Sequence, residues 1–413
     1  MIASAQLNLF DYVTETYGAA ADGAGLLDNS RLYRAVAARA GLSDQDLNAK
    51  VPIGESGQEH SILKRQIRWH QQTLKHLGLI ERVDGVKGLW KLTKEGKHQL
   101  RRAADHVSML AFSTKLGIAI WGDCRKIFSR LDEPIHLMVT SPPYPLARPR
   151  SYGNPTQSEY VDFICAALEP VVANLVPGGS ICLNISNDIF ETGSPARSLY
   201  AERMTIALHD RLGLHLMDRL IWHNASKPPG PVLWASLKRV QLNVGYEPIL
   251  WFTNDPHKVR SDNRRVLEQH TERHLRLIAG GGCQESAEYA DGAYRRRTGS
   301  YGNQTPGKIP KNVLSMGHSC PDHKEYRQDC ERLGLPPHGA VFPATLPNFL
   351  IRFLTEPGDL VADIFAGKLT TAREAERLER RWISTEWMYE YIRGAAERFG
   401  VCDGFWMNPA MCQ

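Results

Sequence analysis

Short apolar runs and stretches with helical spacing alternate along most of the chain after about residue 105. Apolar runs between turn residues are typical of buried strands, and the amphipathic spacing between them predicts connecting helices. Strands that alternate with helices predict an α/β fold, with an open, largely parallel sheet and helices on both faces. The expected strands are 135–139, 180–185, 219–222, 248–252, 359–363 and 382–386, and the expected helices are 160–175, 204–212, 346–355 and 371–378.

The first quarter of the chain has a different pattern. A helix that Asn29 or Ser30 can cap is followed by a cation-rich helix from about His60 and by two short strands around Asp84-Gly85. This order resembles a winged helix, whose second helix enters the major groove of DNA. A small module that contacts only protein is the alternative. We expect further helices to open at 92–96 and to span 97–113 as a linker.

The composition fits a soluble globular protein, with 42% hydrophobic and 23% charged residues. No stretch approaches the roughly 20 apolar residues of a membrane helix, and the N-terminus lacks a secretory pattern, so we expect a cytoplasmic location. The 8 scattered cysteines are therefore expected to be thiols. His and Cys residues between 318 and 338 lack paired Cys-x-x-Cys spacing, so we expect no metal site. The net charge of +5 is compatible with a polyanionic partner.

The clearest candidate for chemistry is the segment Thr140-Ser141-Pro142-Pro143-Tyr144, directly after an expected strand. Ligands of open α/β sheets bind at such strand ends. The two prolines fix the backbone and remove two donors, which holds the Pro142 carbonyl in place as an acceptor. Ser141 adds a hydroxyl acceptor, and Tyr144 adds a flat ring with a polar tip. Two acceptors aimed at the hydrogens of a nucleobase amino group favour a nitrogen whose lone pair is free to attack.

This segment resembles the catalytic signature [DNS]-P-P-[YFW] of the amino-methylating DNA methyltransferases. The resemblance implies a Rossmann-like methyltransferase sheet, S-adenosylmethionine as cofactor, and a base flipped out of double-stranded DNA in a restriction-modification context. It also implies catalytic roles for Ser141, Pro142, Pro143 and Tyr144. Serine at the first position is used mainly for cytosine N4 in this family, which tilts the choice of base towards cytosine and leaves adenine N6 as the alternative.

A second match lies at 359–371, where Asp363, Phe365 and Gly367 follow a strand as in the D-x-F-x-G turn of the same family. Ile364, Lys368 and Leu369 depart from the fuller pattern, which has a proline, a small hydroxyl residue and a glycine at these positions. This departure puts cofactor affinity in doubt and motivates an alternative, an inactive DNA-binding regulator on a methyltransferase fold. The resemblance implies cofactor contacts for Asp363, Phe365, Gly367, Thr370, Glu386, Asp123 and Thr140, with a helix N-cap as the alternative role of Asp123.

Between the two motifs lies an irregular basic segment. Residues 253–313 carry 11 Lys and Arg against 7 Asp and Glu, a balance of +4. The order of catalytic motif, insertion and cofactor motif matches the β class of this family, in which the insertion recognises the target and many members are homodimers. A basic surface binds phosphates, and Arg, Asn and Gln read base edges. The expected DNA contacts are Arg295, Arg296, Arg297, Lys308, Asn303, Gln304 and Lys227.

An enzyme that acts on RNA or on a protein amide is a further alternative, but the DNA-binding-like N-terminal module argues against it.

These patterns divide the chain into six expected parts. The expected parts are an arm (1–26), a winged-helix-like domain (27–104), the catalytic half of the core (105–252), a target-recognition region (253–336), the cofactor half (337–400) and a tail (401–413).

Overall fold

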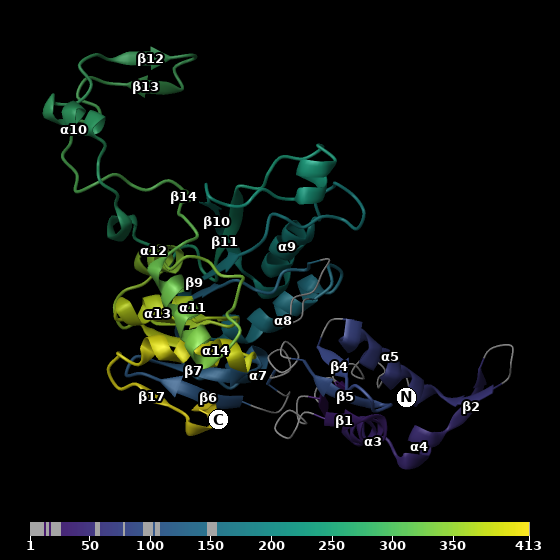
Figure 1. The fold of residues 1–413 in the computed structure, drawn as a ribbon. Coiled ribbons are helices and arrows are strands. Elements are labelled where there is room, and N and C mark those ends of the chain that lie inside the picture. Colours follow the sequence, from purple (N-terminus) through teal and green to yellow (C-terminus); the bar gives the residue numbers. More distant parts are fainter. Residues whose placement is uncertain are drawn as a thin grey trace.

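The computed structural model describes residues 12–13, 16–17, 26–53, 58–76, 79–93, 102–103, 108–146 and 155–412. Its N-terminal part is a small helical module closed by a three-stranded antiparallel sheet of order β1-β5-β4, which fits the expected winged helix (Figure 1). A separate hairpin of β2 and β3 stands between α4 and α5. The elements are β1 (Leu26–Asp28), α3 (Asn29–Arg39), α4 (Asp44–Asn48), β2 (Lys50–Ile53), β3 (Gln58–Ser61), α5 (Ile62–His76), β4 (Ile80–Arg82) and β5 (Leu89–Leu92).

The helix starts in this module differ from those expected. Asp28 caps α3, because its carboxylate accepts from Ser30 N at 2.8 Å and Arg31 N at 2.9 Å. Helix α5 begins at Ile62, since the preceding residues pair in β3. Val13 and Tyr17 are fully buried in the core of the module, so part of the expected arm belongs to it. The helix expected to open at 92–96 lies largely outside the described residues.

The larger part contains a ten-stranded mixed sheet of order β14-β10-β11-β9-β8-β15-β16-β7-β6-β17. The five central strands, from β9 to β7, are parallel, and antiparallel pairs flank them on both sides. The strands are β6 (Ser108–Ser113), β7 (Gly117–Gly122), β8 (Ile135–Thr140), β9 (Leu175–Asn184), β10 (His215–His223), β11 (Tyr246–Thr253), β14 (Val313–Ser315), β15 (Leu360–Asp363), β16 (Arg381–Glu386) and β17 (Trp406–Met407).

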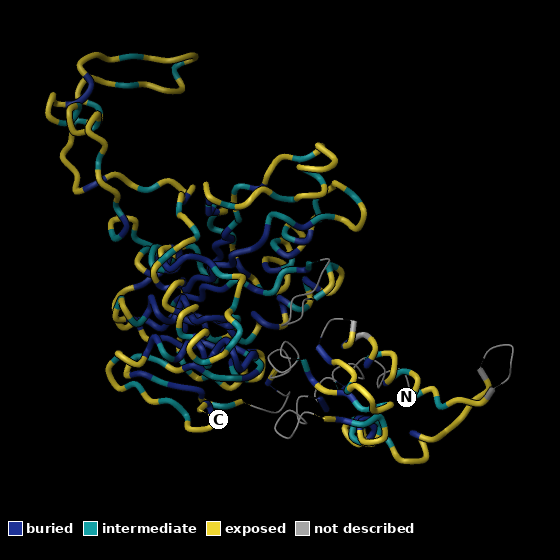
Figure 2. Tube along the Cα trace, in the orientation of Figure 1, coloured by how far each residue is buried: buried dark blue, intermediate teal, exposed yellow. Residues whose placement is uncertain are grey.

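Helices cover both faces of this sheet, as expected for the α/β class. One apolar cluster includes Phe128, Ile164 and Met204, and a second includes Leu350 and Ile392. Figure 2 shows buried positions concentrated in the larger part, where Figure 1 draws the sheet. The first cluster draws on α7 (Cys124–Phe128), α8 (Tyr160–Ala173) and α9 (Tyr200–Leu212); the second draws on α12 (Thr345–Leu354), α13 (Thr370–Arg377) and α14 (Tyr389–Ala396), next to α11 (Pro321–Leu333).

Several expected boundaries are wrong at the edges of the sheet. The expected linker helix over 97–113 gives way to β6, which pairs antiparallel with β7 from residue 108. The strand expected at 180–185 is longer, because β9 begins at Leu175. Strand β14 pairs with β10 and β17 pairs with β6, so neither the recognition region nor the tail is wholly separate from the core. Such short strands have too few residues to show a period of two.

The remaining part of the insertion projects from the core as an arm (Figure 1). It contains α10 (Glu272–Ala279), β12 (Ala287–Tyr289) and β13 (Tyr294–Arg296), and its surface is largely exposed (Figure 2). The short helix η2 (Asn263–Val266), which precedes the arm, packs against α12 of the core. No helix among the described residues has the length and apolarity needed to cross a membrane.

Candidate active site

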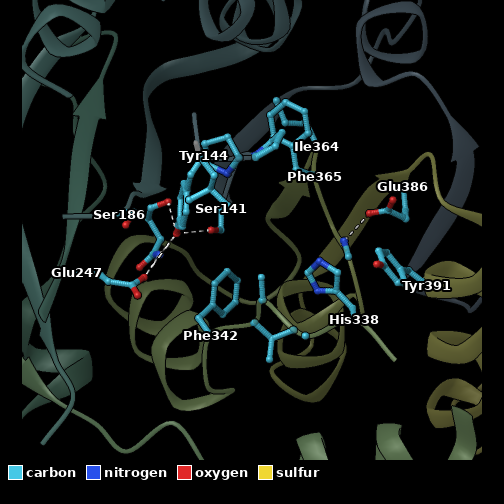
Figure 3. Close-up of a pocket in the computed structure, with 18 of the residues that line it drawn as sticks. Ser141, Tyr144, Ser186, Glu247, His338, Phe342, Ile364, Phe365, Glu386 and Tyr391 are labelled. Atoms are coloured by element: carbon cyan, nitrogen blue, oxygen red, sulfur yellow. Dashed lines mark hydrogen bonds between the residues drawn. The ribbon is translucent and has the colours of Figure 1, made fainter. Parts of the chain in front are cut away.

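A cavity of about 780 Å³ opens at the carboxyl ends of the central strands (Figure 3). This volume is within the usual range for ligand pockets of roughly 300–1,000 Å³. Ser141 and Tyr144 of the loop after β8 line it, and so do Phe365 after β15 and Glu386 at the end of β16. The sheet therefore brings the Ser141–Tyr144 motif and the turn that contains Phe365 to the same cavity, although the two are far apart in the sequence.

The Tyr144 hydroxyl is the centre of a hydrogen-bond network at one end of this cavity. It lies 2.9 Å from Ser141 Oγ, and Asn184 Nδ2 donates to it at 2.8 Å. Burial raises the pKa of Tyr144 well above its ordinary value, so the phenol stays neutral at physiological pH. The ring is thereby fixed against the cavity wall with its hydroxyl directed at Ser141 (Figure 3).

Glu247 extends this network to Lys227. Asn184 Nδ2 also donates to Glu247 Oε2 at 2.9 Å, and Lys227 Nζ donates to Glu247 Oε1 at 2.8 Å. Asn184 is 3% exposed, and its Oδ1 has no hydrogen-bond partner among the described residues. The expected DNA contact Lys227 thus lines the cavity as half of an ion pair. Glu247 itself was missed, because it starts an antiparallel strand and belongs to no local motif.

Thr140 and Asp363 support the cavity from behind. Thr140 Oγ1 donates to Asp363 Oδ1 at 2.7 Å, and Phe365 N donates to the same oxygen at 3.2 Å. Both side chains are buried, and neither lines the cavity. Burial raises the pKa of Asp363 to about 6. The expected cofactor contacts of these residues are therefore replaced by a brace between the two motifs, and the buried Thr370 also lies outside the cavity lining.

Of the departures from the family turn, Ile364 lines the cavity, whereas Lys368 and Leu369 do not. Lys368 is 1% exposed and forms an ion pair with buried Asp322, which also pairs with Arg398. Leu369 adopts a left-handed conformation (φ +59°) and packs in the apolar core, where the family has glycine. Gly367 also has positive φ, and a Cβ there would lie 3.0 Å from the His338 ring. The backbone path of the turn is kept without its second glycine.

Glu386 holds the turn from the next strand. Its Oε2 accepts from Gly367 N at 2.7 Å and its Oε1 accepts from Met388 N at 2.8 Å. Burial raises the pKa of this carboxyl to about 7. Phe365 stacks on Phe163 with a centroid distance of 5.7 Å, which presents an aromatic wall to the same end of the cavity.

Asp123 caps a helix and also lies in the cavity lining. At the start of α7, it accepts from Arg125 N at 2.9 Å. Burial alone would raise the pKa of Asp123, but the hydrogen bonds and the charge of Arg125 outweigh burial and lower it. The carboxylate is therefore ionised and already paired on one side.

The expected DNA contacts on the arm lie away from the cavity. None of the six arm residues lines it, and all but the half-buried Arg296 are exposed. Arg295 pairs with Glu288 at 3.3 Å and Lys308 pairs with Glu268 at 2.7 Å. The basic surface of the arm is therefore separate from the cavity. Within the described ranges, no group of three or more His, Cys, Asp or Glu side chains is placed to hold a metal ion.

The comparisons with known proteins agree with this geometry. A family model described as DNA methylase matches residues 135–397, and one of the Mrr N-terminal domain matches residues 15–102. The chain is 35% identical over 298 residues to type II methyltransferase M.PvuII of Proteus hauseri, covering 70% of this chain and 85% of that protein. It is 25% identical over 264 residues to M.BglII of Bacillus subtilis, covering 63% and 62%.

The same relationship is visible in three dimensions. The solved structure of PvuII DNA methyltransferase, described as cytosine-N4-specific, matches with a TM-score of 0.54 at 33% identity. This match covers 70% of the present chain and 87% of that one. The chain therefore belongs to the DNA methylase family, as an S-adenosylmethionine-dependent DNA amino-methyltransferase that carries an Mrr-type N-terminal domain.

Proposed function

We propose that this protein transfers a methyl group from S-adenosylmethionine to N4 of cytosine in double-stranded DNA. The supporting observation is the pair formed by Ser141 and Tyr144 at the mouth of a strand-end cavity, on a chain 33% identical to a cytosine-N4-specific enzyme. The Ser-Pro-Pro-Tyr loop supplies the acceptors that the amino group needs, and the flipped base lies against the Tyr144 ring. Adenine N6 poses the same chemistry and is the competing target.

The amino group is held by acceptors that point into the cavity. Ser141 Oγ and the Pro142 carbonyl accept the two amino hydrogens, which frees the nitrogen lone pair. Asn184 supports this end of the cavity, because its amide nitrogen donates to the Tyr144 hydroxyl and to Glu247.

The other end of the cavity fits the cofactor. Carboxylates of Glu386 and Asp123 suit hydroxyl and amino donors, and Phe365 offers an apolar face to a planar ring. When bound, S-adenosylmethionine supplies an electrophilic methyl group on a sulfonium. The residues around the amino group would direct the N4 lone pair at this methyl group, with the cofactor sulfur as leaving group, and the proton lost from N4 would pass to solvent. Tyr144 and Glu247 are held in hydrogen bonds throughout, so placement carries most of the catalysis.

The arm serves duplex recognition in this proposal. Arg295, Arg297, Asn303 and Gln304 are exposed on it, where they reach phosphates and base edges. The case for an inactive regulator rested on Lys368 and Leu369. Their side chains turn away from the cavity, which removes that reason.

Mapping of modified bases in DNA from cells that express the protein tests the proposal. We expect N4-methylcytosine at one short sequence, absent from cells that carry Ser141→Ala. N6-methyladenine at a fixed sequence would overturn the choice of base, and unmodified DNA would overturn the activity. If the DNA is unmodified, calorimetry measures whether the protein binds S-adenosylmethionine. Absence of binding would identify a protein that cannot use the cofactor, whereas binding would show that only a suitable DNA site was missing. Sedimentation of the full chain tests the homodimer expected from the family.

A further inference from the structure

The connection between β10 and β11 leaves and re-enters the core at the catalytic cavity. Lys227 and Pro228 line the cavity at its start, and Tyr246 and Glu247 line it at its end. Between them, residues 228–245 form a projecting loop that contains the short helix η1 (Val232–Leu237), and we refer to this segment as the rim loop. Figure 1 shows it projecting from the same end of the core as the arm.

The rim loop exposes more aliphatic surface than a solvated loop needs. Leu237 is 70% exposed and Leu242 is 86% exposed, with Val232, Leu233 and Val240 also exposed. Exposed aliphatic side chains are ordinary when they stand singly, but a group of them beside a functional cavity marks a contact surface. These side chains are therefore candidates for contact with whatever approaches the cavity mouth.

The loop is held in one conformation by its own hydrogen bonds. Val244 N donates to Gly230 O at 2.8 Å and closes the base, and Val240 N donates to Trp234 O at 2.9 Å. Gln241 Nε2 donates to Pro195 O at 3.0 Å and ties the loop to a neighbouring segment. The Trp234 ring lies against Phe190. An outward-facing aliphatic group on a fixed frame acts as a rigid projection.

The charge of the rim loop fits a polyanion. Lys238 and Arg239 are exposed between the aliphatic residues, and the sequence from 228 to 245 contains no Asp or Glu. A duplex presents phosphates to such cations and stacked bases to the aliphatic groups. Proteins that open base steps combine these two features.

We propose that the rim loop is a wedge that enters the DNA duplex, with Leu237 and Leu242 filling the space left by the flipped base while Lys238 and Arg239 contact the flanking phosphates. This inference rests on the proposed function, since it requires a base in the cavity. The flipped base must pass the rim on its way to Ser141, and the rim loop is rooted on both sides of that entrance. Wedge insertion would stabilise the open duplex and thereby lower the cost of flipping.

Methyl transfer by the full chain tests the wedge on two duplexes that carry the mapped site. In one duplex the target base is paired, and in the other it lies opposite an abasic position and is already free. We expect Leu237→Ser with Leu242→Ser to slow transfer at least tenfold on the paired duplex. Transfer on the abasic duplex should stay within about threefold of the wild type. Val401→Ser is the matched control. Val401 is also 86% exposed, but it follows α14 in the chain and does not line the cavity.

Three results would overturn the wedge. Equal loss on both duplexes would show that the loop supports folding or general binding, and unchanged transfer on the paired duplex would show that the leucines do not enter DNA. A wild-type dimer that the double variant converts to monomers would assign the patch to a second copy of the chain. Absence of transfer by the wild type on either duplex would instead contradict the proposed function.

Discussion

Thr140 and Asp363 are 223 positions apart and are joined by a buried hydrogen bond of 2.7 Å between Thr140 Oγ1 and Asp363 Oδ1. Thr140 is the last residue of β8, next to the catalytic loop, and Asp363 is the last residue of β15, next to the cofactor turn. The bond fixes the relative position of the two halves of the active site. Methyl transfer depends on such placement, because the donor and acceptor atoms must meet in line.

Removal of this brace should weaken both stability and turnover. Thr140→Val keeps the shape but leaves the buried Asp363 without its hydroxyl donor, which costs about 1–3 kcal/mol. Urea unfolding should show that loss, and the transfer rate should fall with little change in cofactor affinity. Thr205→Val is the control, since its hydroxyl bonds only within α9 and its loss should be small. Equal effects of the two substitutions would argue against a brace.

The catalytic loop gives a second prediction. Ser141→Ala removes one amino-group acceptor and should reduce transfer by about 10²–10³, by analogy with loss of one electrostatic partner at other active sites. Tyr144→Ala removes the ring as well as the hydroxyl and should abolish transfer. Tyr144→Phe keeps the ring and should retain more activity. Filter binding should show duplex affinity close to that of the wild type for all three variants. Wild-type transfer by both alanine variants would refute the catalytic assignment.

Cofactor affinity should depend on pH through Glu386. Its pKa of about 7 is above the ordinary value because the carboxyl is buried, and hydroxyl donors of a cofactor favour the ionised form. Affinity should therefore fall as pH drops below about 7, by roughly tenfold per unit well below the pKa. Calorimetry at several pH values measures this trend, and Glu386→Gln should remove it. Constant wild-type affinity between pH 5 and 8 would contradict a direct contact.

The same carboxyl has the opposite effect on the stability of the cofactor-free protein. Because the folded pKa is raised from 4.5, the folded state holds a proton that the unfolded state has lost. Its stabilising contribution is complete below pH 4.5 and disappears as pH rises through about 7. The free energy of unfolding of the wild type should therefore fall relative to that of Glu386→Gln as pH rises from 4.5 to about 7, and a constant difference would contradict the raised pKa.

The arm gives a prediction on DNA binding. Arg295→Ala with Arg297→Ala should lower duplex affinity and reduce the slope of log K against log salt by about 0.9 for each lost phosphate contact. Cofactor affinity should not change, because neither side chain lines the cavity. Arg130→Ala is the control, as an exposed arginine on another part of the surface. An unchanged salt slope in the double variant would remove the arm from the phosphate contacts.

The α/β class, the catalytic loop and the cofactor turn could be predicted from the sequence, since each depends on local signals. Val139 and its neighbours form a buried apolar run, and Ser141-Pro142-Pro143-Tyr144 follows at its end. Buried parallel strands are continuous in their apolar pattern, so their ends can be located from the sequence. The mutual position of the two motifs followed only from the rule that parallel strands end on one edge of a sheet.

The tertiary structure decided what individual polar residues do. Asp363 bonds Thr140, Lys368 pairs with Asp322, and Glu247 joins the hydrogen-bond network of Asn184 and Tyr144, none of which a local pattern indicates. Strands β14 and β17 were likewise assigned only by their pairing. Hydrophobic periodicity is a property of neighbours along the chain and therefore sets elements and class. A buried charge or a three-residue strand is stable only through partners that are distant in the sequence, so folding alone determines its role.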